Sequence, residues 1–88
     1  MNNPKRNSEI ETTTLPDGHA VLVNSKTSWA YTLTPLGALV WEFCDGKHSP
    51  QEIAREIKAI GELGERPSLE NEVEELLTVF YDEGFTLA

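Results

Sequence analysis

The sequence predicts a small α+β domain in which a three-stranded antiparallel meander is followed by three helices. Up to Leu33, short runs of β-favouring residues are separated by turn residues, a spacing typical of strands joined by tight turns. From Thr34 on, apolar residues recur at helical spacing, and glycine and proline separate the runs. A chain of 88 residues supports one hydrophobic core, so we expect a single domain.

The N-terminal end differs in composition from the rest of the chain. Residues 1–8 are polar and offer little to bury, so we expect a flexible tail there and the domain over residues 9–88. The β-favouring runs then cover residues 10–15, 19–23 and 29–33. The connections between them are short, which favours antiparallel pairing of neighbouring strands.

The third of these runs is expected to form an edge of the sheet, because it is the last strand of a meander. It contains neither proline nor lysine, which commonly protect such edges, so its outer backbone groups are predicted to be free. Side chains alternate along a strand, which places Trp29, Tyr31 and Leu33 on one face and Ala30 and Thr32 on the other. The large side chains can therefore cover the helices while the backbone edge stays open to a partner.

Capping residues mark the first two helices. Thr34 is predicted to cap the first helix, with Pro35 at its first position, and Asp45–Gly46 is expected to end it. Ser49–Glu52 forms a capping box that starts a second helix over residues 50–60. The residues expected on the buried faces of these helices are Leu36, Leu39, Val40, Phe43, Ile53, Ala54, Ile57 and Ile60.

A third helix is predicted from a cap at Ser68 to the neighbourhood of Gly84. Its expected apolar stripe is Leu69, Val73, Leu76, Leu77 and Phe80. The same helix carries six acidic residues and no basic one, namely Glu70, Glu72, Glu74, Glu75, Asp82 and Glu83. Such a charge run is either a solvated face or a docking face for a basic partner. The sequence leaves open whether residues 85–87 pack on the core or form a short strand.

The overall charge disfavours polyanions as partners. Seven basic residues against fifteen acidic ones give a formal net charge of -8, which repels nucleic-acid phosphates and anionic lipid headgroups. No apolar run is long enough for a membrane span, and the single cysteine, Cys44, cannot form an intramolecular disulfide. We therefore expect a cytoplasmic protein without nucleic-acid or membrane partners, in which Cys44 is buried as a small hydrophobe.

No catalytic constellation is recognisable in the chain. The two histidines, His19 and His48, lie in or next to turns and lack the spacing of metal-binding motifs. Each is expected to be solvated or locally hydrogen-bonded. No phosphate-binding loop, dinucleotide fingerprint or nucleophile elbow occurs. We therefore expect no enzyme activity, no metal ion and no cofactor.

Three neighbouring segments resemble the sequence motif of the PqqD family, also called RiPP recognition elements: Leu33–Gly37, Val40–Gly46 and Ser49–Ile53. The most specific part is Cys44-Asp45-Gly46 at a fixed distance from both flanking helices. The ending Glu83-Gly84-Phe85 is also similar to that of the family, so the resemblance covers residues 15–87. The sequence departs from the family's PQQ-pathway members at residues 9–15, which are acidic and threonine-rich where those members are aromatic and basic.

The resemblance implies a winged-helix-like fold and a peptide chaperone that has no catalytic activity. It implies that the leader segment of a ribosomally made precursor peptide adds as a strand along the third strand, beside the third helix. A peptide-modifying enzyme, often of the radical SAM type, then receives the tethered peptide. Carried over to this sequence, the peptide-binding residues are Trp29, Ala30, Tyr31, Thr32, Leu33, Glu72, Val73, Leu76, Val79 and Glu83. The acidic helix further suggests a leader with lysine or arginine opposite Glu72, Glu75 or Glu83.

Two other functions stay open at this level. Strands combined with three helices overlap the winged-helix architecture of DNA-binding proteins, although the third helix lacks the basic residues that recognition needs. The free edge can instead pair with a second copy of the chain and form a homodimer. The sequence names neither the precursor peptide nor the enzyme, and it does not distinguish a PQQ, lasso peptide or other RiPP pathway.

Overall fold

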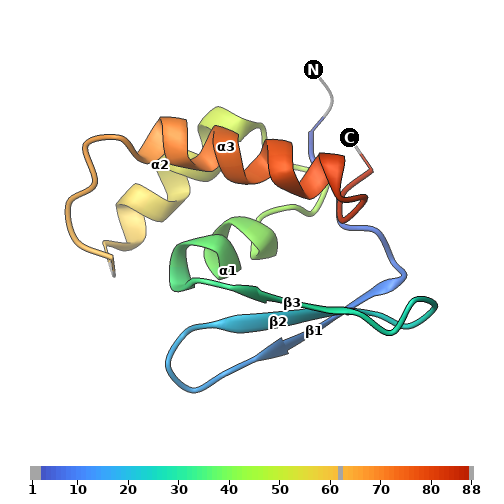
Figure 1. Ribbon diagram of the computed structural model, residues 1–88. Helices are drawn as coiled ribbons and strands as arrows, with labels where there is room; N and C mark the ends of the chain where they lie inside the picture. Colours follow the sequence, from blue (N-terminus) through green and yellow to red (C-terminus); the bar gives the residue numbers. More distant parts are fainter. Residues whose placement is uncertain (1–2, 62, 88) are drawn as a thin grey trace.

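The computed structural model describes residues 3–61 and 63–87. Its elements are the strands β1 (Ile10–Thr14), β2 (Ala20–Asn24) and β3 (Ala30–Leu33) and the helices α1 (Pro35–Glu42), α2 (Pro50–Ile60) and α3 (Leu69–Asp82). The strands form one antiparallel sheet in the order β1-β2-β3. Figure 1 shows the helices on one side of this sheet, with α1 between the sheet and α3. The predicted α+β class is confirmed, and "winged-helix-like" describes it loosely.

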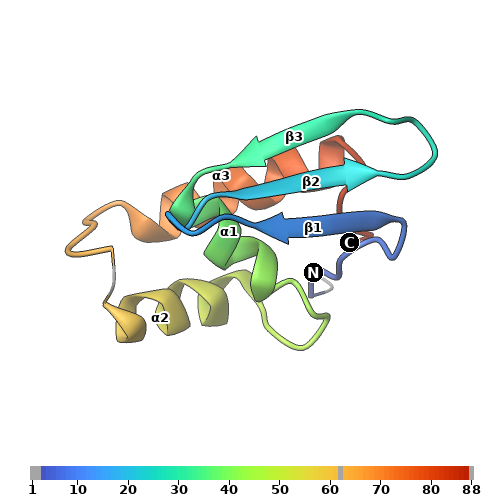
Figure 2. The same cartoon turned by 90° about the horizontal axis from the view of Figure 1, so that it is seen from below.

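Alternation along the strands decides what each face of the sheet carries. β2 pairs with β3 so that Leu22 lies opposite Tyr31 and Ala20 opposite Leu33. Ala20, Leu22 and Leu33 are buried because this face packs on the helices. The opposite face, seen from below in Figure 2, has none of the described helices in front of it. The sheet therefore has one packed side and one solvent-facing side.

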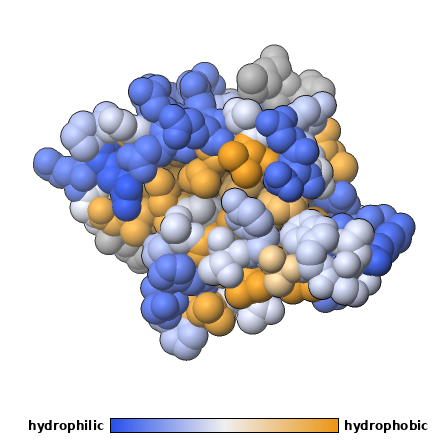
Figure 3. Space-filling view, in the orientation of Figure 1, coloured by the Kyte–Doolittle hydropathy of each residue, from blue (hydrophilic) through white to orange (hydrophobic). Residues whose placement is uncertain are grey.

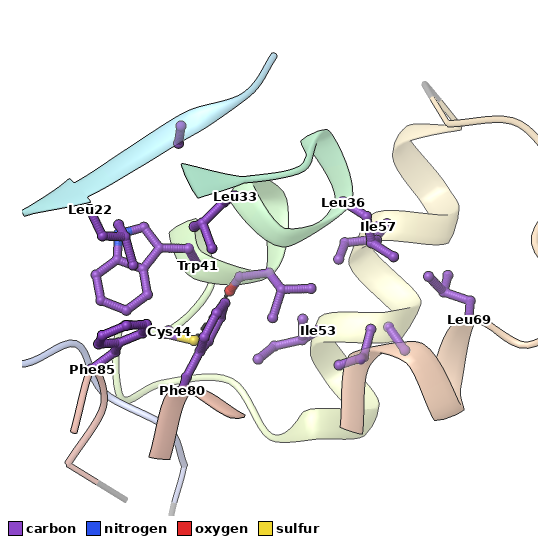
Figure 4. Packing of buried hydrophobic residues seen from close by; sticks show 14 residues of the cluster. Leu22, Leu33, Leu36, Trp41, Cys44, Ile53, Ile57, Leu69, Phe80 and Phe85 are labelled. Atoms are coloured by element: carbon purple, nitrogen blue, oxygen red, sulfur yellow. Dashed lines mark hydrogen bonds between the residues drawn. The ribbon is translucent and has the colours of Figure 1, made fainter. Parts of the chain in front are cut away.

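The hydrophobic core lies between the sheet and the helices and contains a group of aromatic rings. The Trp41 ring of α1 lies edge-on to the Phe80 ring of α3, with centroids 5.5 Å apart. Figure 4 shows Phe85 beside these rings, while aliphatic side chains of α2 fill the other end of the core. One expected core residue is absent from it, because Ile60 is 43% exposed. Ile60 is the last residue of α2, where the chain turns away from the core at Gly61.

Several of the predicted helix caps are present. The Thr34 hydroxyl accepts a hydrogen bond from the Gly37 amide at 3.2 Å, and Ser49 and Glu52 form the reciprocal capping box at α2. Gly84, with a φ of 77°, follows the end of α3. The Phe85 amide then donates to the Phe80 carbonyl at 2.7 Å, as in a Schellman motif.

Two helix ends differ from the expectation. α1 ends at Glu42, before Asp45–Gly46, and Gly46, with a φ of 82°, shapes the turn that follows. Asp45 Oδ1 accepts from the Lys47 amide in this turn at 2.8 Å. Ser68 precedes α3 as predicted but makes no side-chain cap, because its backbone, with a ψ of 22°, is not extended as such a cap requires.

The N-terminal segment also differs from the expected flexible tail. Residues 3–8 lie along the domain, and two isolated β-bridges hold them there, Lys5 with Asp45 and Arg6 with Thr86. The Arg6 guanidinium donates to the last two carbonyls of α1, at the helix end where a glycine cap was expected. Backbone hydrogen bonds order this polar segment, so apolar burial alone did not predict it. Residues 1 and 2, the remainder of the expected tail, lie outside the described part of the chain.

The C-terminal residues combine the two alternatives that the sequence left open. Phe85 is buried in the core at 1% exposure. Thr86 forms the bridge to Arg6, as a residue of a short strand would. Both arrangements occur together because the bridge uses backbone groups, which leaves the Phe85 side chain free to pack in the core.

Candidate functional site

The outer edge of β3 has no partner strand in the part of the chain that the structure describes, since β3 is last in the sheet order. The register identifies the residues that carry the free groups. The Asn24 amide donates to the Trp29 carbonyl at 3.4 Å, and hydrogen-bonded pairs recur at every second residue of an antiparallel ladder. The backbone groups of Tyr31 and Leu33 therefore point to β2. Those of Ala30 and Thr32 point outward.

Aromatic side chains lie on the inner side of this edge. The rings of Trp29 and Tyr31 contact the ring of Phe85, with centroids 5.0 and 5.2 Å apart. Trp29 is half-buried and Tyr31 is 39% exposed, whereas Leu33 is buried in the core. The predicted trio thus covers the helices, as expected, and its first two members also reach the surface beside the edge.

The α3 residues predicted for the site fall into two groups. Val73 is completely buried and belongs to the core beneath the helix. Leu76 is half-buried, and Val79 is 39% exposed. Figure 3 shows hydrophobic surface between the hydrophilic side chains over α3 and the paler surface over the sheet. We use the name β3–α3 strip for the partly exposed apolar side chains of the two elements, Trp29 and Tyr31 at β3 and Leu76 and Val79 on α3.

The helix beside the strip is strongly acidic. Five of its six acidic side chains are exposed: Glu70, Glu74, Glu75, Asp82 and Glu83. Glu72 is less exposed, and its Oε2 accepts from the Arg66 guanidinium at 2.9 Å. The helix dipole disfavours the carboxylates at the C-terminal end of α3. These residues therefore do not stabilise the helix through its dipole.

The remaining reactive side chains lie away from the strip. Cys44 is buried as predicted, and burial raises the pKa of its thiol to about 12, which removes the thiolate needed for reactivity at neutral pH. His48 Nδ1 and Asp45 Oδ1 are joined by a hydrogen bond of 2.9 Å, as expected, whereas His19 Nδ1 lies 3.2 Å from Asp17 Oδ1 and has no hydrogen-bond partner among the described residues. Within the described residues, no group of three or more potential ligands could hold a metal ion, and no helix could span a membrane.

Sequence reasoning did not include Phe85 among the candidate site residues. Its ring supports both Trp29 and Tyr31, yet nothing in residues 29–33 points to it. The available signal was Gly84-Phe85 after an acidic helix end, because a hydrophobic residue after the glycine of a helix C-terminus commonly folds back on the helix.

The fold and the open edge define a small α+β domain that can accept a further strand. The chain belongs to the PqqD family, because the model of the family "Coenzyme PQQ synthesis protein D (PqqD)" matches residues 19–85. The resemblance inferred from the sequence is thereby confirmed. No curated protein matches the chain.

Two solved structures are similar to it over nearly their whole length. One is TbiB1 in complex with the TbiA(beta) leader peptide, which is 21% identical, with 93% of each chain covered and a TM-score of 0.75. The other is a lasso peptide synthetase B1 complexed with the leader peptide, which is 23% identical, with 98% of this chain and 99% of that chain covered and a TM-score of 0.77. At these identities the likeness concerns the fold.

Proposed function

We propose that this protein is a non-catalytic module that binds the leader of a ribosomally made precursor peptide by β-augmentation and presents it to a modifying enzyme. One observation carries the proposal. The outward N–H and C=O groups of Ala30 and Thr32 lie on an open strand edge beside an apolar strip. Family membership and two similar folds that hold leader peptides support it.

The backbone edge supplies the affinity that any extended peptide can use. A leader strand that pairs with β3 exchanges hydrogen bonds with Ala30 and Thr32 and becomes the fourth strand of the sheet. Alternate side chains of the leader then face the β3–α3 strip, because side chains alternate along a strand. Apolar leader residues at those positions would contact Trp29, Tyr31 and Val79.

The acidic helix selects the charge of the leader. Glu75 and Glu83 are exposed on the helix that borders the strip. A lysine or arginine of the leader near either carboxylate speeds the encounter and fixes the direction of the peptide. The proposed ligand is thus an extended peptide with alternating apolar residues and at least one basic residue.

The module itself is proposed to leave the chemistry to its partner enzyme. Its thiol is buried, and His48 is hydrogen-bonded to Asp45. We propose a peptide-modifying enzyme as the second partner, of the radical SAM type that the family resemblance implies or of another peptide-tailoring class. We place the module in the cytoplasm, where a single cysteine stays reduced.

The two alternative functions are less favoured. Duplex DNA would meet an α3 helix with six acidic residues and no basic one between Ser68 and Glu83. A homodimer would consume the same β3 edge and compete with the leader. Anisotropy with duplex DNA at low salt and light scattering over a range of protein concentrations distinguish these outcomes from peptide binding.

The proposal is tested by titrating isotope-labelled protein with synthetic leader peptides while backbone amide shifts are recorded. The probes are the TbiA(beta) leader and the N-terminal halves of short peptides encoded beside the gene of this protein. We expect shifts that gather at residues 29–33 and along α3. Shifts gathered at β1, or no shift with any probe at millimolar concentration, would overturn the proposal.

A further inference from the structure

The backbone of residues 4–7 joins two parts of the chain that lie far apart in sequence. On one side, the Gly46 amide donates to the Pro4 carbonyl at 2.9 Å and the Arg6 amide donates to the Cys44 carbonyl at 2.8 Å. These bonds hold the segment against the loop that follows α1. Pro4 is itself buried, so the segment is packed against the domain from its first residue.

On its other side the same segment holds the C-terminal end. The Asn7 amide donates to the Phe85 carbonyl and the Leu87 amide donates to the Lys5 carbonyl, both at 2.8 Å. The Asn7 side-chain amide adds a bond to the Gly84 carbonyl at 3.2 Å. Residues 4–7 therefore act as a central strand between the loop after α1 and the residues after α3.

The Arg6 side chain fixes this segment to a helix end. Its Nη1 donates to the carbonyls of Trp41 and Glu42 at 2.9 and 2.7 Å. Such carbonyls lack partners within the helix, and a charged donor is a strong partner for them. Because Trp41 also packs on Phe80 and Phe85, the anchor holds a residue that belongs to the aromatic part of the core.

The residue that this segment positions is Phe85. Its amide is bound to the Phe80 carbonyl and its carbonyl is bound to the Asn7 amide, so both of its backbone groups are fixed. Its ring contacts Trp29 and Tyr31, the two aromatic members of the β3–α3 strip. A shift of residues 84–87 would therefore move the support beneath the strip.

We propose that residues 4–7 form a strap that positions Phe85 and thereby shapes the leader-binding strip, with Arg6 as its anchor. This inference rests on the proposed function and extends it to a segment outside residues 19–85, the part that the family model matches. Arg6 is a positioning residue, since its side chain contacts the end of α1 and not the strip.

The test compares three variants with the unaltered chain. One lacks residues 1–7, Arg6→Gln removes the charged anchor, and Lys47→Gln removes one positive charge from an exposed side chain as a matched control. The first readout needs no peptide: nuclear Overhauser contacts between the Phe85 ring and the rings of Trp29 and Tyr31. We expect these contacts to weaken in the first two variants and to persist in Lys47→Gln.

The second readout is affinity for the leader peptide that the unaltered chain binds in the titration above. For Arg6→Gln we expect a loss of about fivefold or more, the lower end of usual couplings between separate positions. Thermal unfolding monitors the fold, and Arg6→Gln decides the question if the truncated chain does not fold. If the folded Arg6→Gln variant kept both the ring contacts and the affinity, the proposal that residues 4–7 position Phe85 would be wrong. If no peptide binds the unaltered chain, the proposed function fails, while the ring contacts still test the strap.

Discussion

The two edges of the sheet differ although both are open in the part of the chain that the structure describes. By the same alternation, the outward backbone groups belong to Thr12 and Thr14 on β1 and to Ala30 and Thr32 on β3. A hollow lined by strap residues, by Asp45 and by Ile10 and Thr12 of the strand itself borders β1. An apolar strip and an acidic helix border β3. A free edge can pair with any strand, whereas the side chains around that edge decide which strand binds.

The largest change is expected in stability, and it tests which backbone groups of β3 point to β2 and which point outward. Tyr31→Pro removes an amide that bonds to β2, so we expect the free energy of unfolding to fall by about 3 kcal/mol or more. Thr32→Pro leaves the pairing with β2 intact and should cost about 1 kcal/mol or less. Urea unfolding measures both values, and equal losses would contradict the register that we assign.

The second prediction sets the two edges directly against each other. Thr32→Pro removes an outward donor from β3 and places a ring against an incoming strand, so leader affinity should fall about tenfold or more. Thr14→Pro makes the same change on β1 and should leave affinity within about twofold. Fluorescence anisotropy with a labelled leader measures the affinities, and circular dichroism verifies both folds. Equal losses at the two edges would mean that β3 is not the preferred one.

The third prediction concerns the charge beside each edge. Combining Glu75→Gln with Glu83→Gln removes two exposed carboxylates of α3, so leader affinity should weaken about threefold at low ionic strength. The difference should shrink at high salt, because exposed charges are screened. Glu11→Gln removes a carboxylate from β1 and serves as the control. A salt-independent loss, or the same loss in the control, would argue against charge selection by α3.

The smallest expected effect is a pH dependence that belongs to the β1 side. The hydrogen bond that His48 donates to the Asp45 carboxylate raises the pKa of His48, so the pair stabilises the fold fully below the unfolded pKa of about 6.5. This contribution is lost as pH rises through the raised pKa. Between about pH 6 and 8 we expect a small fall in unfolding free energy, absent in His48→Gln. Leader affinity should stay constant over the same pH range. If affinity changed together with stability, the His48–Asp45 pair would also influence the β3 edge.

The sequence was sufficient to predict the features that depend on residues close together in the chain. Thr34 and Ser49 cap their helices through bonds within three residues, and Cys44 is buried just after α1. The open edge of β3 followed from a meander that ends there. These features depend on neighbours along the chain, so their pattern could be interpreted without coordinates.

The features that were missed depend on contacts between distant residues. The bonds of Arg6 to the end of α1 span about 35 positions, and no periodicity encodes them. The side of β3 on which each amide points follows from the pairing with β2, which the sequence alone did not fix to the residue. Val73 fits the α3 stripe and was also assigned to the site, and only its complete burial separates the two roles.

The shortness of β3 limits the number of main-chain hydrogen bonds that a bound peptide can form. Ala30 and Thr32 offer one N–H and one C=O each, so at most four main-chain bonds form. At about 1 kcal/mol net apiece they sustain only a roughly millimolar complex. Any tighter binding has to come from side-chain contacts. The four main-chain bonds alone would hold a leader only briefly, so the residence time depends on the side chains that the leader carries.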